Sequence, residues 1–249
     1  MPVDLFYERV GDGPCHLLFV HGWISSCRMW DDVRDRLDTT LWTQHRFDFR
    51  GCGRSPRTLL GHDLTGYADD LRAMLMRIEH PLTIVAHSMG AKVAQFVATE
   101  KPSNLERMIL VAPGTAHSAK TNAKHRALTE AAFGSRRRIE AFQRGAMAVE
   151  IPRTAMERLV EDALSAQREH WFGWYDVGRQ AEFSDRLPAI DVPVLAVAGA
   201  KDPLAPPSVV KRDVAGAIHG AAFAMLRECG HNIPVEKPHD VIEAIRRFI

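Results

Sequence analysis

The segment Ile84–Ala91 constrains the fold of this chain more than any other part of the sequence. An apolar, partly β-branched run leads into the string small-x-Ser-x-small, which spans Ala86–Gly90, and helix-like sequence follows. This pattern is typical of a nucleophile elbow, a tight strand-to-helix turn that presents a serine from its backbone. Ala86 and Gly90 have to be small because the turn brings two backbones close together. The pattern predicts that Ser88 is a nucleophile rather than the N-cap of an ordinary helix.

Two further residues complete a candidate catalytic triad downstream. A serine hydroxyl needs a base, and the base needs an acid that orients it, in the chain order Ser, Asp, His. Asp202 follows a strand predicted over 194–198, and His231 follows a strand predicted over 223–226. Parallel sheets place their active sites in such loops, at the carboxyl ends of the strands. We therefore predict that Ser88, Asp202 and His231 act together.

Three other motifs link the chain to a known superfamily. They are Leu-Leu-Phe-Val-His-Gly-Trp at 17–23, Asp-x-Arg-Gly-x-Gly-x-Ser at 48–55, and Gly-His with Pro-x-Glu-x-Pro at 230–238. With the elbow and the triad order, the chain resembles the α/β-hydrolase superfamily over nearly its whole length. The resemblance implies a serine hydrolase of the carboxylesterase type. The stretch 13–23 is also similar to esterases that cleave pimeloyl-carrier methyl esters.

The order of the predicted elements indicates an α/β fold, a mostly parallel twisted sheet with helices on both faces. Between residues 115 and 187 the strand-like runs stop and charged, helical sequence takes over. We interpret 1–114 and 188–249 as the core domain and 115–187 as an inserted helical cap over the mouth of the sheet. Strands are expected at 5–7, 16–20, 43–48, 83–86, 108–112, 194–198 and 223–226, and core helices at 30–37, 64–78, 91–99 and 238–248.

The expected chemistry is acyl transfer through an acyl-enzyme on Ser88. The oxyanion needs donors that are already in place, and we assign them to the backbone N–H groups of Met89 and Trp23. We expect His21 to shape the loop before Trp23 and to border the substrate pocket. This mechanism requires no metal and no organic cofactor.

Two features of the segment 115–187 bear on the substrate. An aromatic cluster at 171–175, with Met147, Met156 and Phe142, either lines an apolar acyl pocket or only joins the cap to the core. We assign Met147, Trp171 and Trp174 to the pocket. A basic patch, Arg136–Arg138 with Arg126 and Arg144, either docks an acyl carrier protein or an anionic substrate, or forms a solvated helix face.

Composition excludes several functions. The 249 residues carry a formal net charge of +1, which favours neither nucleic acid nor an anionic membrane as a partner. The longest apolar runs are of strand length, and the N-terminus lacks a secretory apolar block, so we expect a cytoplasmic protein. Four cysteines, without metal-site spacing, are expected to be reduced packing residues.

Several functions stay open beside hydrolysis of a small-molecule carboxylic ester. A lactone or a thioester is chemically close to an ester, and carbon–carbon bond hydrolases of this superfamily keep the full triad. Cofactor-free dioxygenases keep the His–Asp pair without depending on the serine. Dehalogenases and epoxide hydrolases carry aspartate at the elbow, so Ser88 argues against both. A non-catalytic receptor that binds a small ligand is the remaining alternative.

Overall fold

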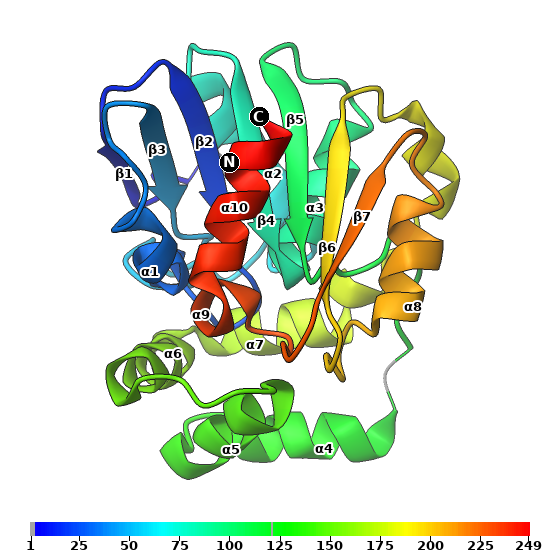
Figure 1. Ribbon diagram of the computed structural model, residues 1–249. Helices are drawn as coiled ribbons and strands as arrows, with labels where there is room; N and C mark the ends of the chain where they lie inside the picture. The colour runs from blue at the N-terminus through cyan, green and yellow to red at the C-terminus, as the bar shows by residue number, and fades with distance from the viewer. Residues whose placement is uncertain (1–2, 121) are drawn as a thin grey trace.

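A twisted sheet of seven strands forms the centre of the computed structural model, which describes residues 3–120 and 122–249 (Figure 1). The strand order is β1-β3-β2-β4-β5-β6-β7; β1 pairs antiparallel with β3, and all other neighbours are parallel. The predicted α/β class is therefore confirmed. The strands are β1 (Tyr7–Val10), β2 (Cys15–Val20), β3 (Trp42–Phe47), β4 (Leu82–His87), β5 (Leu105–Val111), β6 (Val194–Gly199) and β7 (Ala222–Leu226).

Helices cover both faces of the sheet because the inner strands are apolar on both sides. In β4, Ile84 packs into the core beneath α2 (Leu64–Arg77) and α3 (Ser88–Ala98), whereas its neighbour Val85 packs into the opposite core. Figure 1 shows α2 and α3 behind the sheet and α10 in front of it. The front layer consists of α1 (Asp31–Arg34), α9 (Ile233–Glu236) and α10 (Pro238–Phe248).

Two local elements differ from the sequence-based prediction. The helix expected over 30–37 is divided into a 3₁₀ turn, η1 (Cys27–Trp30), and the single turn α1. The Ser26 hydroxyl oxygen accepts the N–H of Arg28 at 3.1 Å, so the helical structure begins earlier than the apolar pattern suggests. The short α8 (Pro207–Val210), which continues into the π-helical turn η4 (Lys211–Ala215), was not predicted.

The segment 115–187, which we call the insertion, connects β5 to β6. Figure 1 shows its helices gathered beyond one end of the sheet, apart from the layers on the two faces. No helix in the described part of the chain has the length and apolar character needed to cross a membrane. The insertion contains α4 (Ala123–Ala132), α5 (Arg136–Ala146), α6 (Arg153–Ser165) and α7 (Arg168–Asp176), then the 3₁₀ turns η2 (Gly178–Gln180) and η3 (Ser184–Ala189), the last of which runs on into the core.

Backbone hydrogen bonds attach the insertion to loops that follow the sheet strands. The N–H of Gln167 donates to the carbonyl of Gly51, after β3, at 2.8 Å. The N–H of His231, after β7, donates to the carbonyl of Ala146 at 2.7 Å. Because these loops lie at the carboxyl ends of the strands, the insertion covers the end of the sheet where parallel α/β folds bind ligands.

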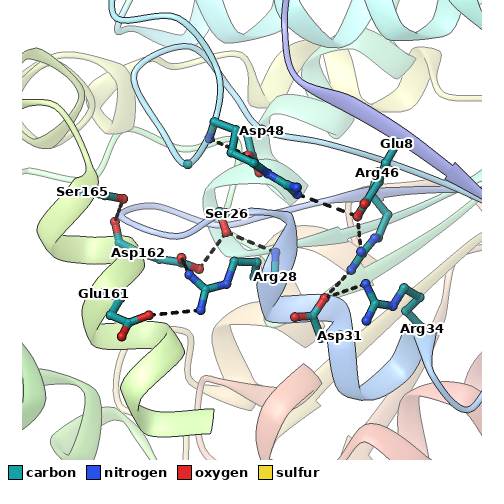
Figure 2. Close-up of a pocket in the computed structure, with 12 residues that line it drawn as sticks. Glu8, Ser26, Arg28, Asp31, Arg34, Arg46, Asp48, Glu161, Asp162 and Ser165 are labelled. Carbon is teal, nitrogen blue, oxygen red and sulfur yellow. Dashed lines mark hydrogen bonds and ion pairs between the residues drawn. The ribbon is translucent and has the colours of Figure 1, made fainter. Parts of the chain in front are cut away.

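A charged cavity of about 470 Å³ lies where α6 meets the core (Figure 2). Asp162 of α6 accepts hydrogen bonds from the Ser26 hydroxyl at 2.7 Å and from Arg28 Nη1 at 3.1 Å. Arg46, only 1% exposed, pairs with Glu8 and Asp31. The charges are largely paired within the cavity, so we interpret it as a polar joint between the insertion and the core.

Candidate active site

Ser88 lies at the turn between β4 and α3 and has a left-handed backbone, with φ of 49°. Non-glycine residues rarely adopt this conformation, and such strain recurs where a site requires it. The turn leaves no room for a side chain at position 90, because a Cβ on Gly90 would lie 2.4 Å from the carbonyl oxygen of His21. The close approach agrees with the prediction that residue 90 has to be small.

Ser88, His231 and Asp202 form a continuous hydrogen-bonded line. The Ser88 hydroxyl donates to His231 Nε2 at 2.9 Å, and His231 Nδ1–H donates to Asp202 Oδ2 at 2.8 Å. Asp202 Oδ1 accepts the N–H groups of Leu204 and Ala205 at 2.8 and 2.9 Å. Burial acts to raise the pKa of the Asp202 carboxyl, but these hydrogen bonds and the imidazole outweigh it, so the pKa lies below its usual value. Asp202 is therefore a carboxylate at neutral pH and orients the imidazole.

A second carboxylate shapes the loop around His231. Glu236 Oε2 accepts the N–H groups of Gly230 at 2.9 Å and of Ala148 at 2.8 Å, and its Oε1 accepts the N–H of Asn232 at 3.0 Å. Glu236 is 8% exposed, and its carboxylate satisfies buried donors on both sides of His231. Glu236 thus holds this loop together with the bond from the His231 N–H to the Ala146 carbonyl.

The backbone at both predicted oxyanion donors comes close to Ser88. Met89 stands in the first turn of α3, where backbone N–H groups have no partner within the helix. Trp23 follows Gly22, and a Cβ on Gly22 would lie 3.3 Å from Ser88 Cβ and 2.6 Å from His87 Nδ1. The Gly22–Trp23 peptide therefore passes close to the serine, which is the approach an oxyanion site requires.

The loop after Trp23 is held in a strained conformation by the insertion. Ile24 has φ of 48°, and its N–H donates to His170 Nε2 at 3.2 Å. The other nitrogen, Nδ1, then carries a proton and donates to Tyr67 Oη at 2.7 Å. Burial keeps the pKa of His170 well below its usual value, so the ring is neutral and acts as an acceptor for Ile24.

Two residues that the sequence assigned to the pocket lie elsewhere. His21 is fully buried, its Nε2 accepts the N–H of Phe49 at 2.9 Å, and its Nδ1–H donates to the carbonyl of Gly22 at 2.8 Å. Burial lowers the pKa of His21, so it is a neutral residue that shapes the loop. Met147 packs between the core and the interior of the insertion. Neither His21 nor Met147 is among the described residues that line the cavity at Ser88.

The cavity at Ser88 has a volume of about 860 Å³ and lies between the core and the insertion. Trp171 and Trp174 line it, as does Trp23, whose ring lies 5.2 Å from that of Trp171. Trp23 Nε1 also donates to the Trp171 carbonyl at 3.2 Å, so the aromatic cluster both lines the cavity and joins the insertion to the core. The sequence offered no signal for Arg179, which also lines the cavity.

The predicted basic patch is divided in the structure. Arg126 Nε donates to Asp176 at 2.6 Å, and Arg144 Nη2 donates to Glu140 at 2.7 Å. Arg138 instead lines the cavity at Ser88. A continuous docking surface of five unpaired arginines is therefore absent from the described residues.

Cys229, two residues before His231, offers no second nucleophile. All four are free thiols, and burial raises the pKa of the Cys229 thiol, near His231, to about 12. A thiol with such a pKa is a packing residue at neutral pH. In the part of the chain that the structure describes, no group of His, Cys, Asp and Glu side chains is arranged to hold a metal ion.

Comparison with known proteins agrees with the fold. The esterase EaEST from Exiguobacterium antarcticum superposes with a TM-score of 0.89 at 20% identity, covering 98% of this chain and 94% of its own. A non-heme chloroperoxidase from Streptomyces lividans is 26% identical over 222 residues, which are 82% of this chain and 80% of the relative. A pimeloyl-[acyl-carrier protein] methyl ester esterase from Klebsiella pneumoniae is 30% identical over 122 residues, 47% of this chain and 44% of that esterase.

The fold and these likenesses define an α/β-hydrolase. The family model described as serine aminopeptidase, S33, matches residues 15–238, so the chain belongs to this family of hydrolases. The chloroperoxidase and the methyl ester esterase differ in the reactions that their names describe, and one fold supports many reactions. The substrate therefore has to be argued from the site.

Proposed function

We propose that this protein is a serine hydrolase that cleaves carboxylic esters of small to medium size through an acyl-enzyme on Ser88. The observation that carries the proposal is the unbroken line of hydrogen bonds from Ser88 Oγ through the His231 imidazole to the Asp202 carboxylate. At its Ser88 end, this line borders a cavity large enough for a medium-sized ligand.

The proposed reaction has two steps. His231 Nε2 takes the proton of the Ser88 hydroxyl as its oxygen attacks the ester carbonyl carbon, and the N–H groups of Met89 and Trp23 bind the oxyanion. The intermediate collapses, the C–O bond to the alcohol breaks, and His231 returns the proton to the leaving alcohol. Water then attacks the acyl-enzyme with His231 as base, which releases the acid and restores Ser88.

The insertion is proposed to act as the cap of this site. Its residues form much of the cavity wall, including Trp171 and Trp174, so chain-length preference follows from their packing. Lactones and thioesters react by the same steps and stay as alternative substrates. An acyl carrier protein at the basic patch also stays a prediction, which the pairing of Arg126 and Arg144 weakens.

The test is hydrolysis of p-nitrophenyl esters from acetyl to dodecanoyl by the parent protein and by Ser88→Ala. We expect serine-dependent turnover with an optimum in acyl length, and a stoichiometric fluorophosphonate adduct on the peptide that contains Ser88. Ser208→Ala is the matched control, because Ser208 is exposed on α8 and is not among the residues that line the cavity.

Two results would contradict this function. Full esterase activity in Ser88→Ala would show that Ser88 is not the nucleophile. A folded parent protein that cleaves no ester would show that esters are not the substrate. A carbon–carbon bond hydrolase, a cofactor-free dioxygenase or a non-catalytic binder would then be the function to test.

A further inference from the structure

The charged side chains in the wall of the cavity at Ser88 have one sign. Arg138 and Arg179 line it, together with the ionisable His125, but no Asp or Glu is among its described lining residues. The chain as a whole is nearly neutral, with 32 basic and 31 acidic residues. A wall with two cations and no carboxylate is therefore a local property of this cavity.

Arg179 is held in place from the core. The ammonium group of Lys92 donates to the Arg179 carbonyl at 3.0 Å, and Lys92 stands one helical turn after Ser88 on α3. The guanidinium carbon of Arg179 lies 4.7 Å from the centre of the Tyr175 ring, which also lines the cavity. An arginine stacked on an aromatic face keeps its edge donors available to a ligand.

Arg138 comes from the insertion. It stands in the first turn of α5, and its Nη1 donates to the carbonyl of Ala131 at 3.2 Å. Among the ion pairs of the described residues, none joins a carboxylate to Arg138 or Arg179, whereas their neighbours Arg126 and Arg144 both have such a partner. The two arginines that line this cavity thus have no carboxylate partner among the described residues.

We propose that Arg138 and Arg179 bind a carboxylate on the substrate, distant from the bond that is cleaved, and so select esters of dicarboxylic acids that carry one free acid group. A guanidinium binds a carboxylate through two parallel N–H···O bonds, and such charged hydrogen bonds are among the strongest in proteins. The inference rests on the proposed function for turnover, but binding of the anion does not require Ser88 to act.

A pair of matched substrates tests the selection. The mono-p-nitrophenyl ester of octanedioic acid and p-nitrophenyl octanoate have the same acyl length and differ in the distal carboxylate. We expect the parent protein to favour the anionic ester in kcat/KM by about tenfold at low salt, and the double variant Arg138→Gln/Arg179→Gln to lose that preference. Arg136→Gln is the control, because Arg136 is exposed on the same turn of α5 and is not part of the lining.

A binding measurement separates this proposal from the catalytic one. Trp23, Trp171 and Trp174 line the cavity, so quenching of tryptophan fluorescence reports its occupancy. In Ser88→Ala we expect octanedioate to bind more tightly than octanoate, and the double variant to remove the difference. Equal affinity for the two acids in Ser88→Ala, or an unchanged preference in the double variant, would overturn the proposal whether or not the enzyme cleaves esters.

Discussion

The backbone N–H of His231 donates to the carbonyl of Ala146 over 2.7 Å, so the proposed catalytic base is attached directly to the last residue of α5. The neighbouring Gly230 passes so close that a Cβ on it would lie 2.4 Å from the same oxygen. Movement of α5 relative to the core must therefore either carry His231 along or break this bond. The insertion and the triad are mechanically linked.

Gly230→Ala tests this link. The new methyl group would meet backbone atoms, which cannot yield as a flexible side chain does, so the loop with His231 has to shift. We expect kcat to fall by about a hundredfold, because small displacements of a catalytic group are costly. Gly145→Ala is the control, since a Cβ there meets nothing within 4 Å. Equal activities of the two variants in the p-nitrophenyl ester assay would contradict the link.

Asp202→Asn tests the role of the carboxylate. An amide in its place presents a donor to His231 Nδ1, which favours the tautomer whose Nε2 is protonated and unable to accept the Ser88 proton. We expect kcat to fall by about ten-thousand-fold while KM changes little. Steady-state kinetics on one ester measure both constants. A fall in kcat of less than tenfold would show that Asp202 is not the acid of the triad.

Lys92→Met tests how the insertion is anchored. The ammonium group of Lys92 donates to the carbonyls of His117 and Arg179 at 3.0 Å and of Ala181 at 2.7 Å, and so joins both ends of the insertion to α3. Without it these partly buried acceptors lose their partner, and we expect the free energy of unfolding to fall by about 2–3 kcal/mol in urea titrations. Lys101→Met, which breaks an exposed pair, should change it little.

Limited proteolysis gives the same prediction an independent readout. Cleavage within 115–187 should be faster in Lys92→Met than in Lys101→Met, because detachment of the insertion exposes its connections to the core. Identical cleavage rates in the two variants would show that Lys92 is not the anchor.

Asp162→Asn tests the polar joint through pH. Burial, helped by nearby carboxylates and opposed by Ser26 and Arg28, raises the pKa of Asp162 to about 6, whereas in the unfolded chain it is about 4. Between these values the folded protein holds a proton that the unfolded chain has released, so the contribution of Asp162 to stability falls as pH rises.

An asparagine side chain does not titrate, so in Asp162→Asn the contribution of residue 162 to the free energy of unfolding no longer changes with pH. From pH 4 to pH 7 the free energy of unfolding should shift by about 2 kcal/mol in favour of Asp162→Asn relative to the parent protein. Urea titrations of both proteins across this range measure the shift. A difference that stays constant with pH would mean that Asp162 keeps an ordinary pKa.

Strong local patterns predicted most of the sheet. Uninterrupted apolar runs such as 84–86 and 194–198 lie within β4 and β6, and α10 has the predicted bounds, because an amphipathic stripe and a proline at its first position define it. The prediction for 30–37 was less accurate because tertiary contacts, and the capping by Ser26, decide where a short helix begins.

The residues of the candidate site differ in how far sequence reveals them. The candidate triad could be predicted because each member follows a recognisable strand and the three occur in the chain order Ser, Asp, His. The structure brings Ser88, Asp202 and His231 within hydrogen-bonding distance. Arg179 and Met147 lie in the insertion, whose helices pack by contacts between residues distant in sequence. No periodicity distinguishes a side chain that faces the cavity from one that faces another helix.

The strands that flank the insertion, β5 and β6, are hydrogen-bonded neighbours, with Met108 opposite Val194 and Val111 opposite Val197. The chain thus leaves the sheet at the carboxyl end of β5 and re-enters it at the amino end of the neighbouring parallel strand. A crossover of a different length can connect the two strands without altering their register, provided that it reaches from one end of the sheet to the other. Exchanging 115–187 for the corresponding segment of another family member would therefore keep the sheet but replace much of the wall of the cavity at Ser88. The new segment would also have to supply the contacts that Ala146 and His170 now make with the loops after β7 and after Trp23.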